Sequence, residues 1–93
     1  MGKFRVIVSA KAQKDLLAIH KSGDKASIKK VEQIFAELAI HPESGTGKPE
    51  KLKFDLIGYW SRRINKKDRL IYLIENNIIT VTVVSALGHY ENK

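Results

Sequence analysis

The sequence predicts an α+β fold in which a helical hairpin covers one face of a small, mostly antiparallel sheet. Three observations predict this fold: a strand-like alternation near the start of the chain, two helical patterns separated by Ser22-Gly23, and three strand-like segments after Gly58. The expected element order is β-α-α-β-β-β, and a run of helices followed by a run of strands is typical of this class. We expect residues 1–93 to form a single domain, because the sequence contains no repeat or linker.

The first half of the chain is expected to contain one strand and both helices. Apolar side chains alternate with others over 4–9, which predicts a strand. A helix is predicted over 10–21, and Ser22-Gly23 ends it because glycine readily adopts the left-handed conformation found after helices. A second helix is predicted over 24–40, with Asp24 as its N-cap and His41-Pro42 after its end. Its apolar positions follow helical spacing: Ile28, Val31, Ile34, Phe35 and Leu38.

The second half of the chain is expected to be a loop followed by three strands. Residues 42–53 contain two prolines, two glycines and little apolar content, which predicts a loop. Strand patterns then occupy 59–64, 69–75 and 78–87. The segments between them are rich in residues that tolerate turn geometry, namely Asn65-Lys66-Lys67-Asp68 and Asn76-Asn77.

Composition narrows the classes of function. The chain has 43% hydrophobic and 29% charged residues, as expected for a folded protein, and no cysteine. The absence of cysteine excludes disulfides, thiolate nucleophiles and Cys-based metal sites. No His, Asp and Glu spacing resembles a metal site, and no phosphate-binding or dinucleotide-binding motif is present, so no cofactor is expected. The first residues are too short an apolar run for a signal peptide and no stretch approaches a membrane helix, so we expect a cytoplasmic protein without a membrane partner.

The positive charge is concentrated in one segment. The formal net charge is +7, and the segment between Gly47 and Tyr72 holds eight Lys and Arg side chains against three carboxylates. Aromatic side chains are interleaved with these cations. A basic cluster that contains aromatics and a carboxylate suits a polyanion that is both bound and chemically processed.

Glu50 is the candidate base within this basic segment. It is the only acidic residue in 46–54 and is surrounded by Lys48, Lys51 and Lys53. Nearby cations favour the ionised carboxylate, which suits a group that accepts a proton. The alternative is a surface glutamate that only neutralises its neighbours.

Arg62, Arg63 and Arg69 are the candidate phosphate ligands. Consecutive strand residues point to opposite faces, so only one of Arg62 and Arg63 can share a face with Arg69 and Lys53. Two guanidinium groups that converge on one face repel each other unless an anion lies between them, and the planar guanidinium matches phosphate oxygens well. The alternative is a set of solvated strand arginines.

His89, next to Tyr90 near the end of the sequence, is the candidate acid. With Glu50, Arg63 and Arg69 it completes the groups needed for metal-free RNA cleavage. Glu50 would accept the 2′-hydroxyl proton, the arginines would stabilise the phosphorane, and His89 would protonate the departing 5′-oxygen. This reaction requires RNA and leaves a 2′,3′-cyclic phosphate.

These residues also resemble a known family. The resemblance rests on Gly47-Lys48-Pro49-Glu50-Lys51-Leu52-Lys53, Gly58-Tyr59-Trp60-Ser61-Arg62-Arg63-Ile64, Asp68-Arg69-Leu70-Ile71-Tyr72 and His89-Tyr90. Together these motifs are similar to those of the YoeB/Txe toxins of the RelE/ParE toxin–antitoxin superfamily. They are dense over 42–72 and 89–90, whereas over 1–41 the similarity is one of element order.

The resemblance implies a ribosome-dependent mRNA endoribonuclease that inhibits translation. It places the general base on Glu50, the main phosphate-stabilising cation on Arg69, and the acid and the base-stacking group on His89 and Tyr90. It adds phosphate contacts from Lys53 and Arg63, to which the charge pattern adds Lys48 and Arg62. It also implies a YefM/Axe-type antitoxin, promoter DNA bound only by the joint complex, and a toxin homodimer.

Two other functions remain open from the sequence. One is a ParE-like toxin that acts on DNA gyrase without nuclease chemistry, and the other is a nucleic-acid-binding module without catalysis. The sequence also departs from the family, because Glu91-Asn92-Lys93 follows the His-Tyr pair with which familiar members end. An additional acid at this position would change the position or the pKa of His89.

Overall fold

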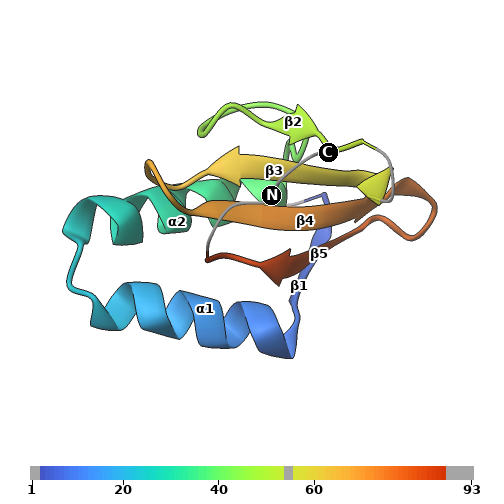
Figure 1. The fold of residues 1–93 in the computed structure, drawn as a ribbon. Helices are drawn as coiled ribbons and strands as arrows, with labels where there is room; N and C mark the ends of the chain where they lie inside the picture. The colour runs from blue at the N-terminus through green and yellow to red at the C-terminus, as the bar shows by residue number, and fades with distance from the viewer. Residues whose placement is uncertain (1–2, 54–55, 88–93) are drawn as a thin grey trace.

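The structure, a computed structural model, describes residues 3–53 and 56–87. In this part of the chain it has two α-helices and one five-stranded sheet, which confirms the predicted α+β class (Figure 1). No helix among these residues is long and apolar enough to cross a membrane. In chain order the elements are β1 (Arg5–Val8), α1 (Ala10–Lys21), α2 (Lys25–Leu38), β2 (Glu50–Lys51), β3 (Tyr59–Arg63), β4 (Arg69–Glu75), the 3-10 helix η2 (Asn76–Ile78) and β5 (Thr80–Ser85).

The strands are ordered β1-β5-β4-β3-β2 across the sheet. Strands β2 to β5 pair antiparallel with their neighbours, whereas β1 is parallel to β5, with Val6 opposite Val81. The sheet is therefore mostly antiparallel, as predicted, with one parallel edge. The β4–β5 pairing is interrupted by a bulge next to Ile71, which lies opposite Ser85.

Side-chain caps explain where the helices begin. The Ser9 side chain accepts a hydrogen bond from the Ala12 N–H at the start of α1. Asp24 accepts one from the Ser27 N–H at the start of α2, so the predicted N-cap is confirmed. Between the helices, Gly23 adopts a left-handed conformation with φ 76°. The Ser9 and Asp24 side chains thus satisfy backbone N–H donors that a helix start otherwise leaves without partners.

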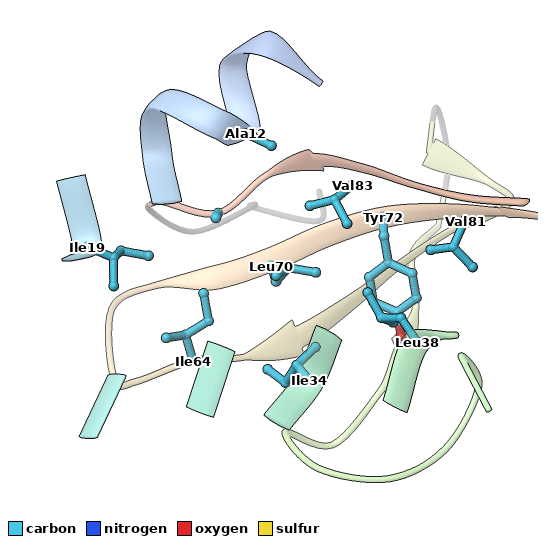
Figure 2. Packing of buried hydrophobic residues seen from close by; sticks show 10 residues of the cluster. Ala12, Ile19, Ile34, Leu38, Ile64, Leu70, Tyr72, Val81 and Val83 are labelled. Carbon is cyan, nitrogen blue, oxygen red and sulfur yellow. The ribbon is translucent and has the colours of Figure 1, made fainter. Parts of the chain in front are cut away.

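The core lies between the helical hairpin and one face of the sheet (Figure 2). Alternate residues of β4 and β5, Leu70 and Tyr72 with Val81 and Val83, point into it and are fully buried. The helices contribute Ile19, Ile34 and Leu38, and Ile64 directly follows the end of β3. The cluster consists of Ala12, Ile19, Ile34, Leu38, Ile64, Leu70, Tyr72, Val81, Val83 and Ala86.

The structure differs from the sequence prediction at two connections. The predicted loop 42–53 contains the two-residue strand β2, which pairs with β3 at the edge of the sheet. The predicted turn at Asn76-Asn77 is a turn of 3-10 helix, closed by Ile79 in the left-handed conformation with φ 49°. Both elements are too short to produce a periodic pattern, so tertiary context determines them.

Candidate active site

The sheet face opposite the helices carries three of the candidate groups, Glu50, Arg63 and Arg69. On β3, Trp60 and Arg62 point towards the helices, so the intervening Ser61 and the following Arg63 point the other way. We define the outer face as this second face, with the side chains of Glu50, Ser61, Arg63, Arg69 and Ile71.

Strand register brings these side chains together. Glu50 of β2 lies opposite Ser61 of β3, and Arg63 lies opposite Arg69 of β4. Residues directly opposite each other in antiparallel strands have Cβ atoms about 4.5–5.5 Å apart, and diagonal neighbours about 7–8 Å apart. Glu50 and Arg63 are diagonal neighbours, and Arg69 lies directly beyond Arg63, so one carboxylate and two guanidinium groups occupy the same part of the outer face.

The chemistry available on this face follows from exposure and charge. Glu50 and Arg63 are exposed and Arg69 is half-buried, so all three remain accessible to a ligand. Two opposed guanidinium groups repel each other, and a phosphate between them would relieve that repulsion. The carboxylate beside them can accept a proton from a hydroxyl on the same ligand.

The other predicted ligands lie around this face. Lys48 precedes β2, is exposed, and has a positive φ of 50°. Lys53 is exposed just after β2. His89 and Tyr90 lie outside the described residues. In the described part of the chain, no group of three His, Asp or Glu side chains could hold a metal ion.

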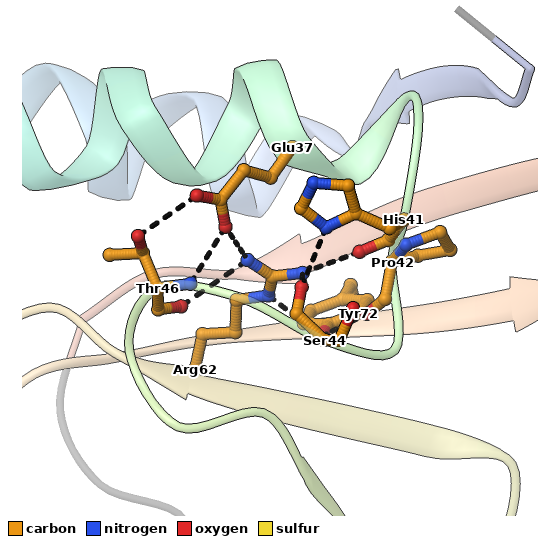
Figure 3. Close-up of polar contacts among 7 residues, drawn as sticks. All are labelled: Glu37, His41, Pro42, Ser44, Thr46, Arg62 and Tyr72. Atoms are coloured by element: carbon orange, nitrogen blue, oxygen red, sulfur yellow. Dashed lines mark hydrogen bonds and ion pairs between the residues drawn. The ribbon is translucent and has the colours of Figure 1, made fainter.

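The prediction that Arg62 contacts phosphate is wrong for this structure. Its side chain is fully buried and points to the opposite side of the sheet from Arg63. An arginine has five N–H donors, and all five of Arg62 are occupied by protein oxygens (Figure 3). The acceptors are Tyr72 Oη at 3.1 Å, Glu37 Oε1 at 2.5 Å, and the carbonyl oxygens of Thr46 at 3.2 Å, His41 at 3.0 Å and Ser44 at 2.7 Å.

This network holds the connection between α2 and β2. Glu37 also accepts hydrogen bonds from the Thr46 N–H at 2.8 Å and the Thr46 hydroxyl at 2.9 Å. Tyr72 donates from its hydroxyl to the Pro42 carbonyl at 2.7 Å, and burial raises the pKa of that hydroxyl. Residues 41–46 are thereby attached to α2, β3 and β4 through side chains, although they form no regular element themselves.

The ionised form of Glu37 is favoured in this network. Burial alone would raise the pKa of Glu37, but hydrogen bonds from Thr46 and Arg62 and the charge of Arg62 outweigh it. The pKa therefore lies below the ordinary value of a glutamate. The carboxylate remains charged opposite the guanidinium, which a buried arginine requires.

Gly47 connects this hydrogen-bond network to the strand that contains Glu50. The Arg63 N–H donates to the Gly47 carbonyl at 2.7 Å, so the chain joins the edge of β3 three residues before Glu50. Gly47 has φ 86°, and a Cβ there would lie 2.8 Å from the Arg63 carbonyl oxygen. Only glycine allows this close approach without strain. The Arg62 network and this backbone bond thus hold the segment that leads into β2.

Ser61 is a further polar residue of the outer face that sequence reasoning missed. It is 1% exposed and lies between Glu50 on β2 and Ile71 on β4. Within residues 3–53 and 56–87, its hydroxyl is the buried side-chain group without a hydrogen-bond partner. Buried hydroxyls are usually paired, so an unpaired one beside a candidate base is a feature of the site. Strand alternation, counted back from Arg63, places Ser61 on this face. It does not indicate that the Ser61 hydroxyl lacks a hydrogen-bond partner.

The fold is that of small bacterial toxins. A YoeB/ParE toxin from Agrobacterium tumefaciens superposes with a TM-score of 0.81 at 28% sequence identity, over 94% of this chain and 100% of that one. A structure described as the YoeB dimer from Staphylococcus aureus superposes with a TM-score of 0.77 at 32% identity, over 95% of this chain and 99% of that one.

Comparisons of the sequence identify the family more specifically than the fold does. The family model of the YoeB-like toxins of bacterial type II toxin–antitoxin systems matches residues 9–90. Toxin YoeB of Synechocystis is 41% identical over 68 residues, which are 73% of this chain and 77% of the relative. Toxin YoeB of Streptomyces coelicolor is 42% identical over 67 residues, 72% of this chain and 77% of the relative. The chain belongs to the YoeB-like toxin family, which confirms the resemblance seen in the sequence.

Proposed function

We propose that this toxin is an endoribonuclease that cleaves mRNA on the ribosome and thereby inhibits translation. The observation that carries the proposal is the strand register that gathers Glu50, Arg63 and Arg69 on the outer face of a YoeB-family chain. A base beside two cations is the arrangement that cleavage at a 2′-hydroxyl needs. An exposed basic face would be sufficient to bind RNA, so the base is the group that points to cleavage.

Each group has a defined role in the proposed reaction. Glu50 accepts the proton of the 2′-hydroxyl, whose oxygen attacks the adjacent phosphorus. Arg69 and Arg63 stabilise the negative charge that develops on the phosphorane oxygens. The P–O bond to the 5′-oxygen breaks, His89 protonates that oxygen, and a 2′,3′-cyclic phosphate remains on the upstream fragment.

The route of the chain after β5 supports the assignment of His89. Ser85 lies opposite Ile71 of the outer face, so β5 ends beside the candidate site. The next residue is fixed, because the Ala86 N–H donates to Asp15 at 3.0 Å. His89 is three positions further along the chain, and three extended residues span at most about 10 Å. This reach is consistent with a His89 side chain at the candidate site. In this proposal Tyr90 stacks on or orients a base.

The remaining predicted contacts and partners complete the proposal. Lys48 and Lys53 contact RNA phosphates on either side of β2. A YefM/Axe-type antitoxin neutralises the toxin, the joint complex binds its promoter DNA, and the toxin forms a homodimer. The structural neighbours support the first and last of these, because they include a YoeB–YefM complex and a YoeB dimer, both from Staphylococcus aureus. We place the toxin in the cytoplasm, where ribosomes are found.

The decisive test replaces the base and keeps its shape. We expect Glu50→Gln to retain ribosome binding and to lower single-turnover mRNA cleavage by about 10²–10⁴-fold, the usual loss for a general base. Glu43→Gln is the matched control, because Glu43 is also exposed and lies in the same connection but outside the strand pairing. The readout is the 5′ ends of mRNA on programmed ribosomes, with a 2′-deoxy nucleotide at the cut site as the substrate control.

Three results would contradict the proposal. Unchanged cleavage by Glu50→Gln would remove Glu50 from the reaction. Growth arrest without any mRNA cleavage, but with inhibited DNA supercoiling, would favour a ParE-like action on gyrase. Retarded mobility of RNA without discrete cuts would indicate a binding module only.

A further inference from the structure

A second basic site lies at the end of β3, next to the outer face. It is a pocket of about 330 Å³ lined by residues of α2, of the connection before β2, of β3 and of the β3–β4 turn. Its lining contains one cation from each of four segments and no carboxylate. The cations are Lys30 of α2, Lys48, Arg63 of β3 and Lys66 of the turn.

No ion pair within the described residues neutralises these four cations. Between residues 3–53 and 56–87, the ion pairs are Lys11–Asp15 and Arg62–Glu37, and neither includes a cation of the pocket. Lys30 is half-buried, although it belongs to a helix whose other lysines, such as Lys29, are exposed. Four like charges around one small cavity repel one another unless an anion occupies it. The pocket therefore has the charge distribution of an anion site.

We propose that this pocket binds a phosphate group of the RNA strand next to the phosphate that is cleaved. This inference rests on the proposed RNA-cleaving function and adds a second contact point for the same strand. Arg63 connects the two sites, because it lines the pocket and also lies opposite Arg69 on the outer face. A strand whose scissile phosphate lies between Glu50 and Arg69 continues past Arg63 into the pocket.

The shape of the pocket favours phosphate. Its lining includes Gly47, which has no side chain to occupy the pocket. A guanidinium group and several ammonium groups on different sides can bind the oxygens of one phosphate together. The volume is sufficient for a phosphate group with its ester oxygens.

The test distinguishes binding in the pocket from an effect of net positive charge on RNA affinity. We compare the double variant Lys30→Ala/Lys66→Ala with the double variant Lys29→Ala/Lys67→Ala. Each pair removes one charge from α2 and one from the β3–β4 turn, but Lys29 and Lys67 do not line the pocket. The probe is a single-stranded 2′-O-methyl oligoribonucleotide, which cannot be cleaved, and the measurement is its affinity for the full chain as a function of salt.

We expect the pocket variant to bind the probe about tenfold more weakly and the control variant to bind it nearly as the unmodified chain does. The slope of log affinity against log salt should fall in magnitude by about 0.7 for the pocket variant, the value for one phosphate on a single strand. A probe with one methylphosphonate at the position that fills the pocket should lose affinity for the unmodified chain and lose none for the pocket variant. All four substitutions are at polar surface positions, and equal melting temperatures verify that folding is retained.

Three results would overturn the inference. Equal losses in both double variants would show that only net charge matters. Unchanged affinity in the pocket variant would show that RNA does not reach the pocket. Loss of binding to a glutamate-rich peptide with no effect on RNA would assign the pocket to an acidic protein segment. Because the probe cannot be cleaved, none of these readouts depends on catalysis, so the proposed cleavage stands or fails separately.

Discussion

Removal of the Arg62 side chain should destabilise the whole domain, because this buried group connects four parts of the chain. Arg62→Ala leaves the Glu37 carboxylate without its counterion and removes a donor from the carbonyls of His41, Ser44 and Thr46. Loss of one partner of a buried ion pair typically costs about 3–5 kcal/mol.

The lower end of that range applies here. Glu37 is 18% exposed at its side chain and keeps both hydrogen bonds from Thr46, so water and the hydroxyl compensate in part. We therefore expect the free energy of unfolding to fall by about 3 kcal/mol. For a domain of this size that corresponds to a decrease of about 12–24 °C in melting temperature.

The assay is urea unfolding followed by circular dichroism, with Arg63→Ala as the matched control. Arg63 is the neighbouring arginine on the same strand but is exposed, so its removal should change stability by no more than about 0.5 kcal/mol. Addition of Glu37→Gln to Arg62→Ala should cost little more, because the partner is already absent. A loss below about 1 kcal/mol for Arg62→Ala, or equal losses for both arginines, would refute the proposed anchoring role.

Two further predictions concern pH and the outer face. The lowered pKa of Glu37 means that its contribution to stability is present above the ordinary glutamate value of 4.5 and is lost as pH falls through the lowered pKa. The stability difference between the unmodified chain and Glu37→Gln should therefore shrink as the pH falls below 4.5 and through the lowered pKa, as measured by urea unfolding; a constant difference would show that the charge of Glu37 is irrelevant. Ser61→Ala should leave the melting temperature unchanged or raise it, because the substitution removes a buried hydroxyl without a described partner. A decrease of more than about 1 kcal/mol in unfolding free energy would indicate that this hydroxyl does have a stabilising contact.

Periodicity explains why most of the fold could be predicted from the sequence. Helix α1 was predicted at its observed bounds, and so was β4, because both are long enough for their apolar spacing to be distinct. Helix α2 ends at Leu38 rather than at about Ile40, where the Ile40 N–H donates to Glu37 in a tighter turn. Strand β2 has only two residues and depends on its pairing with β3, so no local pattern indicates it.

Strand alternation made the faces of the candidate site residues predictable. It could not predict which of their side chains are buried. Alternation separates Arg62 from Arg63 and correctly allows only one of them to share a face with Arg69. It cannot determine which of the two is buried, because an internal arginine requires a counterion supplied from far along the chain. That counterion is Glu37, which lies 25 positions before Arg62 on a helix and has no distinctive spacing in the sequence.

The parallel pairing of β1 with β5 has a consequence for how the molecule folds. Each residue of β1 pairs with one 75 positions later, as Arg5 does with Thr80. Closing a loop of that length costs about 4 kcal/mol in its length-dependent part, whereas β3, β4 and β5 can form a meander through short connections. We expect the meander to form first on refolding, with β1 and the helical hairpin docking onto it in the slow step. Substitutions within β1 should then accelerate unfolding while leaving the early hairpin pairing unaffected.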